Sequence, residues 1–264
     1  MNRENTPIRA LILDMDGVLW RDQQPIGYLP EVFRRIEERG YKAALATNNA
    51  TLSIQQYLNK LDGFGVHLDA WQIVNSAEAT AAYLEKLFPD GGRIFMIGEN
   101  GLEETLNRRG FVHSDDDEEE VIAVIAGLDR KLTFEKLGKA ARHIQSGVLF
   151  IGTNPDRSFP TPKGLIPGAG AILAALEAAT DIKATIIGKP QPEMYLLALQ
   201  RLGTRPEQTL VVGDRLETDI AGAQAIGCRT GLVLSGIADE PAGLAWRPKL
   251  DYIEADLTTL IEKL

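Results

Sequence analysis

The feature that most constrains the fold is a series of short apolar runs separated by longer stretches of helical period. The runs include IRALILD, KAALAT, RIFMIG, VIAVIAG and TLVVGD. Continuous apolar runs of this length are typical of strands that are buried on both faces of a sheet. The stretches at residues 30–39, 77–88, 134–144 and 193–202 carry apolar residues at helical spacing. This alternation predicts an α/β fold with a doubly wound, Rossmann-like parallel sheet.

Composition excludes several classes of partner. With 264 residues, 44% of them hydrophobic, the chain can form one large domain or two smaller ones. Its net charge of −9 leaves no excess of Lys and Arg to follow nucleic-acid phosphates or an anionic membrane. The single cysteine, Cys228, excludes an intramolecular disulfide, and no apolar run approaches the roughly 18 residues of a membrane span. We therefore expect a cytoplasmic protein without a nucleic-acid or membrane partner.

Polar residues follow several of the predicted strands directly. Asp14 ends ALILD, Thr47 ends AALAT, Lys189 follows ATIIG and Asp214 ends LVVGD. A single Asp at a strand end often caps a turn. Parallel sheets, however, bind their ligands at the carboxyl ends of the strands. We expect four strands to deliver one reactive group each to the same edge.

The acidic residues near this edge would repel one another. Asp14, Asp16, Asp214 and Asp219 carry like charges, and each like pair at about 4 Å costs about 4 kcal/mol at an effective dielectric constant of 20. Lys189 supplies one compensating charge. Converging carboxylates are also the ligands that Mg²⁺ prefers, and Mg²⁺ beside a lysine offsets charge on phosphoryl oxygens. The sequence therefore predicts a magnesium-dependent phosphoryl site.

The spacing of the first two carboxylates fits phosphoester hydrolysis. Residues two apart on an extended chain lie on the same face. Asp14 could attack phosphorus and form an aspartyl-phosphate. Asp16 could then give a proton to the leaving oxygen and later take one from the attacking water.

Four segments in order along the chain resemble the motifs of the haloacid dehalogenase superfamily, within its NagD-like or nitrophenyl phosphatase group (subfamily IIA). They are DMDGVLW, ATNNA, GKPQPEMY and VVGDRLETDI. The resemblance implies a phosphatase with Asp14 as nucleophile and Asp16 as general acid and base. It also implies that Lys189 carries the third motif, and that Thr47 holds a phosphoryl oxygen while Asn48 and Asn49 complete that loop.

The same resemblance implies a metal site. In the family, the ion is held by the first Asp of the opening motif, the backbone carbonyl of the second Asp and an Asp of the fourth motif. Here these are Asp14, Asp16 and Asp214. Asp219 is expected next to the ligands rather than on the Mg²⁺ ion itself.

The resemblance also places an α/β cap between the second and third motifs. We expect residues 80–182 to form the cap, and residues 1–79 with 183–264 to form a discontinuous catalytic core. The segment that begins GTNPDRSFPTPKG resembles the part of the cap that faces the pocket, and caps of this group often mediate homodimers. Its candidates for substrate binding are Asn154, Arg157, Ser158, Phe159 and Lys163. A Pro-containing turn with exposed residues explains the same pattern.

The predicted function is hydrolysis of a small phosphorylated metabolite, with p-nitrophenyl, glycolate, glycerol, sugar and nucleotide phosphates all open. One alternative is a phospho-accepting receiver module, but its acidic pair and acceptor Asp follow different strands and it is about half as long. A dinucleotide-binding oxidoreductase requires G-x-G-x-x-G after the first strand, which DMDGVLWR lacks. Trp20 closely follows the first motif, and lining of the cavity and plain packing both explain it.

Overall fold

The structure is a computed structural model that describes residues 6–116, 119–161 and 163–264. The chain folds into two compact units, each with its own parallel sheet. The predicted α/β class with Rossmann-like sheets is confirmed. The first unit contains the residues up to Thr47, Gln55–Val74 and Lys189–Leu264, and the second contains Asn48–Ile54 and Asn75–Gly188.

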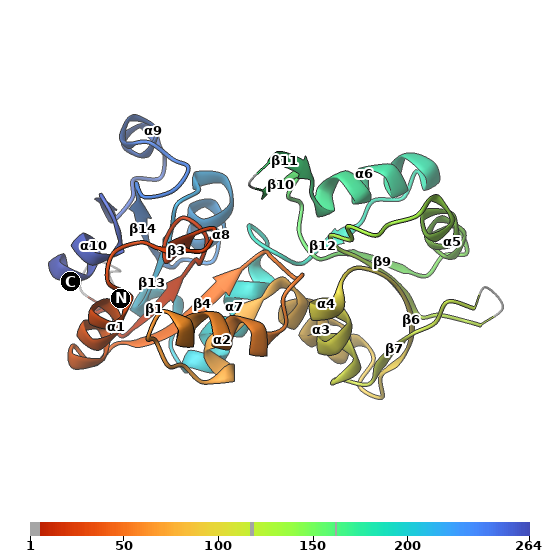
Figure 1. Cartoon of the computed structure of the whole chain (residues 1–264), viewed down its shortest axis with the longest axis horizontal. Helices are drawn as coiled ribbons and strands as arrows, with labels where there is room; N and C mark the ends of the chain where they lie inside the picture. Colours follow the sequence, from red (N-terminus) through yellow and green to blue (C-terminus); the bar gives the residue numbers. More distant parts are fainter. Residues whose placement is uncertain (1–5, 117–118, 162) are drawn as a thin grey trace. The chain divides into compact units, whose positions relative to one another are not determined.

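The first unit is built on a six-stranded sheet (Figure 1). Its order is β15 (Tyr252–Glu254), β14 (Arg229–Val233), β13 (Thr209–Gly213), β1 (Ala10–Leu13), β4 (Lys42–Thr47) and β5 (Ile73–Asn75). The pairs from β15 to β4 are all parallel. All four residues of β1 are fully buried, as expected of a central strand covered on both faces.

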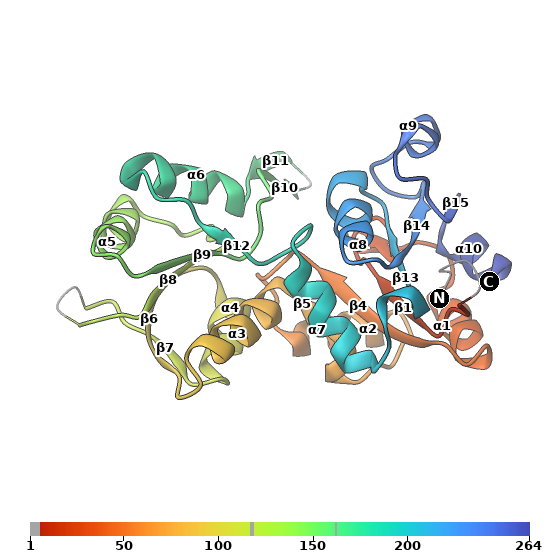
Figure 2. The same ribbon diagram turned by 180° about the vertical axis from the view of Figure 1, so that it is seen from behind.

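Helices cover both faces of this sheet. Figure 1 shows α2 in front of the sheet, and Figure 2, from behind, shows α7 in front of it. Helix α1 buries residues 29, 32 and 36, which lie on one helical face. The helices of this unit are α1 (Leu29–Glu38), α2 (Ile54–Gly63), α7 (Pro192–Leu202), α8 (Ala221–Ala225), α9 (Glu240–Ala245) and α10 (Leu257–Lys263). Short elements complete it: β2 (Trp20–Arg21), β3 (Gln24–Pro25), η2 (Ala70–Gln72), η3 (Pro206–Gln208) and the π-helix η4 (Leu216–Ile220).

The second unit has a five-stranded parallel sheet and an antiparallel hairpin. The sheet order is β12 (Thr185–Ile186), β9 (Leu149–Gly152), β8 (Ala123–Ala126), β6 (Gly92–Ile97) and β7 (Phe111–His113). The hairpin consists of β10 (Ser158–Thr161) and β11 (Gly164–Pro167). The helices are α3 (Ser76–Leu87), α4 (Asn100–Asn107), α5 (Phe134–Gln145) and α6 (Ala169–Thr180). An apolar core that includes Phe95, Val124 and Leu173 fills this unit.

One expectation about the strands is wrong. We expected Lys189 to follow a strand of the same sheet as Asp14, but the preceding strand β12 has two residues and pairs with β9 in the second unit. Lys189 lies in the loop between β12 and α7. An apolar run as short as ATIIG does not reveal which sheet it joins, and β12 is an edge strand whose two residues are exposed and partly buried.

The unit boundaries also differ from those expected. The longer segment of the second unit begins at Asn75. The side chain of Asn75 accepts a hydrogen bond from the backbone N–H of Glu78 as the N-cap of α3. The expected boundary at residue 80 falls inside that helix. The unit ends at Gly188 and also includes residues 48–54.

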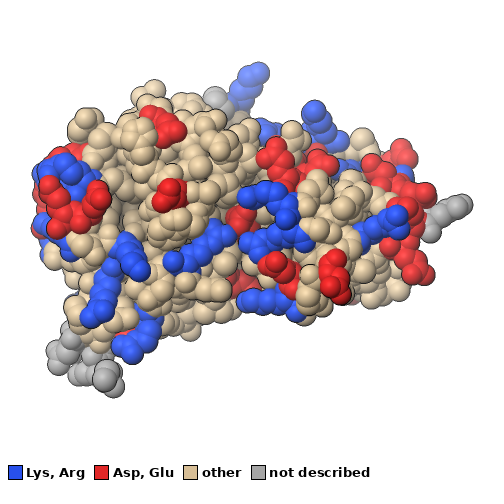
Figure 3. Space-filling model, turned by 90° about the horizontal axis from the view of Figure 1, so that it is seen from below, with Lys and Arg blue, Asp and Glu red and all other residues tan. Residues whose placement is uncertain are grey.

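Charge is mixed on one face of the molecule. Figure 3 shows basic and acidic side chains interspersed on the same face. Among the residues that the structure describes, no helix combines the length and the apolar character required to cross a bilayer.

Candidate active site

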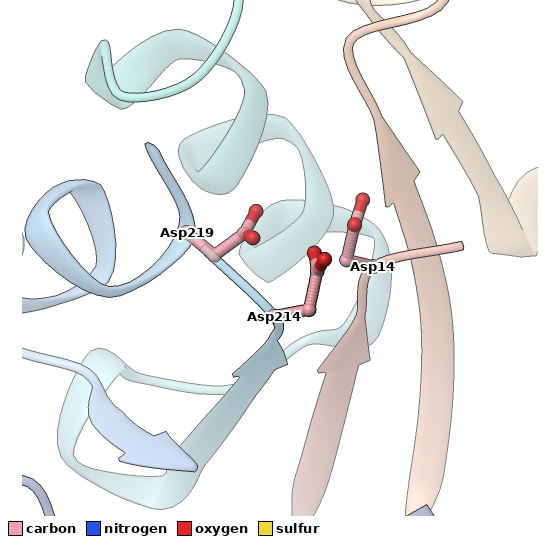
Figure 4. Close-up of side chains that lie close together, drawn as sticks. All are labelled: Asp14, Asp214 and Asp219. Atoms are coloured by element: carbon pink, nitrogen blue, oxygen red, sulfur yellow. The ribbon is translucent and has the colours of Figure 1, made fainter. Parts of the chain in front are cut away.

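Three carboxylates converge where two adjacent strands of the first unit end. The backbone N–H of Asp14 donates to the carbonyl of Val212 at 2.8 Å, so Asp14 and Asp214 follow neighbouring strands at nearly the same level. Asp219 comes from η4, which follows β13. One carboxylate oxygen from each of Asp14, Asp214 and Asp219 lies within 4.8 Å of the other two (Figure 4). All three residues are buried, with exposed fractions of 9%, 1% and 1%.

Lys189 joins two of these carboxylates. Its Nζ donates to Oδ1 of Asp14 at 2.6 Å, to Oδ1 of Asp219 at 2.7 Å and to the carbonyl of Ala46 at 3.0 Å. The ammonium group is itself buried, so these contacts replace its hydration. The structure thus brings together Asp14, Lys189, Asp214 and Asp219, as the sequence predicted.

Acidic groups outnumber the single lysine in this cluster, which shifts their pKa values. Burial is the main reason that the pKa of Asp14 lies well above its usual value, and repulsion from Asp219 and Asp214 adds to the shift against the opposing effect of Lys189. Burial and Asp219 likewise raise the pKa of Asp214 to about 6. Burial lowers the pKa of Lys189, but Asp14 and Asp219 together outweigh it and the net pKa is raised. The cluster therefore holds negative charge that a further cation would stabilise.

The donor set fits a divalent cation. Oδ1 of Asp214 is buried and has no hydrogen-bond partner among the described residues, whereas its Oδ2 accepts from the N–H of Ile237 at 2.9 Å. A buried carboxylate oxygen without a donor is costly unless something else satisfies it. Oδ2 of Asp219 accepts from the N–H of Arg215 at 3.1 Å, so that both Asp219 oxygens have protein partners. Asp214 and Asp14 are therefore better placed than Asp219 to bind an ion such as Mg²⁺.

Asp16 lies apart from this carboxylate cluster. Asp16 is exposed, and its Oδ1 accepts a hydrogen bond from Nε1 of Trp20 at 2.9 Å. Gly17, which follows it, has φ +84°, a conformation that favours glycine. Strand β1 ends at Leu13 and the backbone turns after Asp16, so the extended chain that was expected to place Asp14 and Asp16 on one face is not present.

Two buried tyrosines of the site were not anticipated from the sequence. Tyr57 on α2 forms a side-chain hydrogen bond with Thr47, which is buried at the end of β4. Burial raises the pKa of Tyr57 well above its usual value, so the phenol stays protonated. Oη of Tyr195 on α7 donates to the carbonyls of Thr218 and Asp219. Tyr195 is the last residue of the motif GKPQPEMY, whereas Tyr57 occupies an apolar helix position and no sequence signal distinguishes it from an ordinary core residue.

The predicted substrate-binding residues of the second unit form an internally bonded loop. Nδ2 of Asn154 donates to the carbonyl of Asn48 at 2.8 Å, and Oδ1 of Asn49 accepts from the N–H of Thr51 at 2.9 Å. Oδ1 of Asn154 accepts from the N–H of Asp156 at 3.1 Å, which is the side-chain turn expected as the alternative for this segment.

The remaining candidates lie on or beside the β10–β11 hairpin. Arg157, Ser158 and Lys163 are exposed, and Phe159 is partly buried. Their substrate roles stay predictions, as do those of Asn48, Asn49 and Asn154.

Gly17 provides a test of how closely the backbone encloses Asp214. A Cβ at Gly17 would collide with the Asp214 carboxylate, whereas one at Gly40, which has a similar φ of +72°, would meet nothing within 4 Å. We expect Gly17→Ala to weaken Mg²⁺ binding at least about tenfold, because the carboxylate must move. Gly40→Ala carries the same backbone strain and should leave the affinity unchanged. Titration of Mg²⁺ by calorimetry checks both variants, and equal affinities would contradict the expectation.

Comparison with known proteins places this site in a family. A family model described as haloacid dehalogenase-like hydrolase matches residues 11–112, and one described as HAD-hydrolase-like matches residues 186–260. The chain is 34% identical over 230 residues to an acid sugar phosphatase of Staphylococcus aureus, covering 87% of this chain and 88% of that protein. The chain belongs to the haloacid dehalogenase-like hydrolases. Within them it falls into the NagD-like group predicted from its motifs, and it is a phosphoric monoester hydrolase.

Solved structures of this family agree in fold over almost the whole chain. A p-nitrophenyl phosphatase from Archaeoglobus fulgidus superposes with a TM-score of 0.91 at 33% identity, covering 98% of this chain and 100% of that one. A glycerol phosphate phosphatase from Mycobacterium tuberculosis, solved in complex with magnesium, superposes with a TM-score of 0.89 at 31% identity. That match covers 96% of this chain and 76% of the mycobacterial one. The receiver-module alternative finds no support in these matches.

Proposed function

We propose that this hydrolase cleaves small phosphomonoesters with Mg²⁺ through an aspartyl-phosphate on Asp14. The observation that carries the proposal is the buried Asp14, Asp214 and Asp219 cluster, in which Lys189 binds two carboxylates and Oδ1 of Asp214 has no donor among the described residues. A divalent cation would offset the excess negative charge of these carboxylates. Together with Lys189 it would also offset the negative charge of a bound phosphoryl group.

Two of the proposed metal ligands rest on this geometry, and the third, the backbone carbonyl of Asp16, is what the family resemblance implies. Mg²⁺ would be held by the carboxylates of Asp14 and Asp214 and by the backbone carbonyl of Asp16, with Asp219 fixing Lys189 instead. When bound, the ion offsets negative charge on the phosphoryl oxygens. Because a neighbour in the family was solved with magnesium, the same ion is the first to test here.

The chain's own residues account for the two chemical steps. A carboxylate oxygen of Asp14 attacks phosphorus, the phosphoester bond breaks, and Asp16 gives its proton to the departing oxygen. Asp16 then takes a proton from water, whose oxygen attacks phosphorus and releases phosphate from Asp14. Lys189 and the hydroxyl of Thr47 stabilise the phosphoryl oxygens in both steps.

The substrate class, the role of the second unit and the oligomeric state are proposed from the relatives and from the family resemblance. Relatives are named acid sugar, p-nitrophenyl and glycerol phosphate phosphatases, so we propose a small phosphorylated metabolite. We further propose that the second unit acts as a cap, that Arg157 and Phe159 contact the leaving group, and that the cap mediates a homodimer. The cytoplasmic location stays a prediction from the sequence.

Metal removal tests the proposal directly. We expect repeated release of phosphate from p-nitrophenyl phosphate with Mg²⁺, near-complete loss with a chelator, and recovery when Mg²⁺ is restored in excess. A rate that is unaffected by chelation would contradict the metal assignment. A panel of phosphorylated metabolites, ranked by kcat/KM, then identifies the substrate class.

The acid role of Asp16 has a test of its own. In Asp16→Asn, release of the first equivalent of alcohol from an alkyl phosphate should slow by about a hundredfold to ten-thousandfold, because an alkoxide leaves poorly without a proton. p-Nitrophenolate leaves without one, so its first equivalent should be released at close to the normal rate. Rapid-quench kinetics on both esters measures this difference, and an equal loss for the two would argue against proton donation.

A further inference from the structure

The indole of Trp20 binds the carboxylate that we propose as general acid. Its Nε1 lies 2.9 Å from Oδ1 of Asp16. An indole N–H is a donor and never an acceptor. This contact therefore commits Oδ1 of Asp16 to accepting a hydrogen bond. The proton that Asp16 transfers is thereby directed to its other oxygen, Oδ2.

The indole is buried and contacts a neighbouring ring and a lysine. Trp20 is 1% exposed, its ring lies 5.9 Å from that of Phe64, and Nζ of Lys60 stands 4.1 Å from its centroid. The same Nζ donates to the carbonyl of Asp22 at 2.8 Å, in the turn between β2 and β3. Lys60 thus holds both the indole and the hairpin that carries it.

The turn between Asp16 and Trp20 is closed as well. The N–H of Gly17 donates to the carbonyl of Trp20 at 2.8 Å, and Oγ of Ser235 donates to the carbonyl of Gly17 at 2.7 Å. Nε of Arg21 donates to the carbonyl of Ser235 at 2.7 Å. The donor and its acceptor are therefore held on one rigid loop, although Asp16 itself is exposed.

We infer that Trp20 is a positioning residue that orients the Asp16 carboxyl and makes Oδ2 the oxygen through which the leaving group receives its proton. The inference rests on the proposed role of Asp16. An exposed carboxylate without this contact would rotate about its Cβ–Cγ bond, and either oxygen would carry the proton. Fixing one oxygen removes this rotational freedom, and limiting the freedom of a reacting group lowers the entropic cost of proton transfer.

Trp20→Phe tests this inference, because it removes the N–H and keeps an aromatic ring at the position that contacts Phe64 and Lys60. Loss of a hydrogen bond to a charged group corresponds to about a tenfold to hundredfold change in rate. We expect this loss in the release of the first equivalent of alcohol from an alkyl phosphate. For p-nitrophenyl phosphate the change should stay within about threefold. A structural defect would slow both esters alike.

Trp71→Phe is the matched control. It also removes an indole N–H that donates to an aspartate, Oδ2 of Asp69 at 3.3 Å, but in η2 and on a residue that is 41% exposed. Both esters should react at the normal rate in this variant. The inference would be overturned if the ratio of the rates on the two esters changed equally in Trp20→Phe and Trp71→Phe.

The double variant Asp16→Asn with Trp20→Phe separates this inference from the proposed function. If Trp20 acts through Asp16, the double variant should be no slower in alkyl phosphate cleavage than Asp16→Asn alone. A further tenfold loss would overturn the inference. If Asp16→Asn itself shows no leaving-group dependence, the proposed acid fails instead.

A measurement on the Asp16 side avoids any dependence on the folding of Trp20→Phe. The chain has three tryptophans, so three indole N–H resonances are expected in a ¹⁵N spectrum. Asp16→Ala removes the acceptor and should shift one resonance and speed its exchange with water, while the other two stay in place. Three unchanged resonances would overturn the inference.

Discussion

Asp14→Asn is expected to lower kcat at least about a thousandfold while the protein remains folded. The amide is nearly the same size as the carboxylate, but it cannot attack phosphorus, so the covalent route is lost. Lys189 keeps its contacts with Asp219 and the carbonyl of Ala46, so the buried ammonium remains partnered. Turnover of p-nitrophenyl phosphate at saturating Mg²⁺ measures the loss, and circular dichroism checks the fold.

Asp22→Asn is the control for this variant. Asp22 lies on the same segment as Asp14 but in an exposed turn with φ +53°, which Asn also adopts readily. Its kcat should remain unchanged. Brief incubation with ³²P-labelled substrate and acid quenching should trap a phosphorylated enzyme in wild type and none in Asp14→Asn. Residual turnover above about one part in a hundred would refute Asp14 as the nucleophile.

The part of the site that the sequence predicts is the part that strand order fixes. Asp14 and Asp214 end apolar runs, and runs of this kind become parallel strands whose carboxyl ends share one edge. Adjacent pairing of β1 and β13 then brings the two carboxylates together. Lys189 follows a further apolar run and Asp219 belongs to the fourth motif, and the structure places these two residues in contact.

Other parts depend on tertiary contacts that local pattern does not encode. The hydrogen bond between Tyr57 and Thr47 requires α2 to pack over the end of β4, and the contact between Lys60 and Trp20 joins α2 to the β2–β3 hairpin. Lys189 shows the same limit, because its preceding strand joins the sheet of the second unit. A pattern of apolar and polar residues indicates which side chains are buried, but not which of them meet.

Asp214→Asn is expected to stabilise the metal-free protein at neutral pH and to abolish its stabilisation by Mg²⁺. Burial and Asp219 raise the pKa of Asp214 to about 6 in the folded protein, from a usual value of 3.8. The folded state therefore retains a proton that the unfolded chain releases. The free energy of unfolding falls as the pH rises from about 4 to about 6. Above a pH of about 6 the folded protein carries the full destabilisation of a charged, buried Asp214. Its size is on the order of 3 kcal/mol.

The neutral amide removes that penalty and can still accept the hydrogen bond from the N–H of Ile237. At pH 7.5 with a chelator, we expect the Tm of Asp214→Asn to exceed that of wild type by several degrees. At pH 4 the two Tm values should converge, because wild-type Asp214 is then protonated. Asp22→Asn should follow wild type at both pH values. A Tm at pH 7.5 below that of wild type would contradict the sign of the effect.

Adding Mg²⁺ should reverse the order of stability. An ion at a hundred times its Kd stabilises the folded state by about 2.7 kcal/mol, and wild type should gain this increment at pH 7.5. Asp214→Asn lacks the charged oxygen that is buried without a donor among the described residues, so its gain should be close to zero. Thermal unfolding with and without Mg²⁺ measures both gains. An equal gain in the two proteins would mean that the ion binds elsewhere. Removing a group that binds the ion in the folded state must reduce the stabilisation that the ion provides.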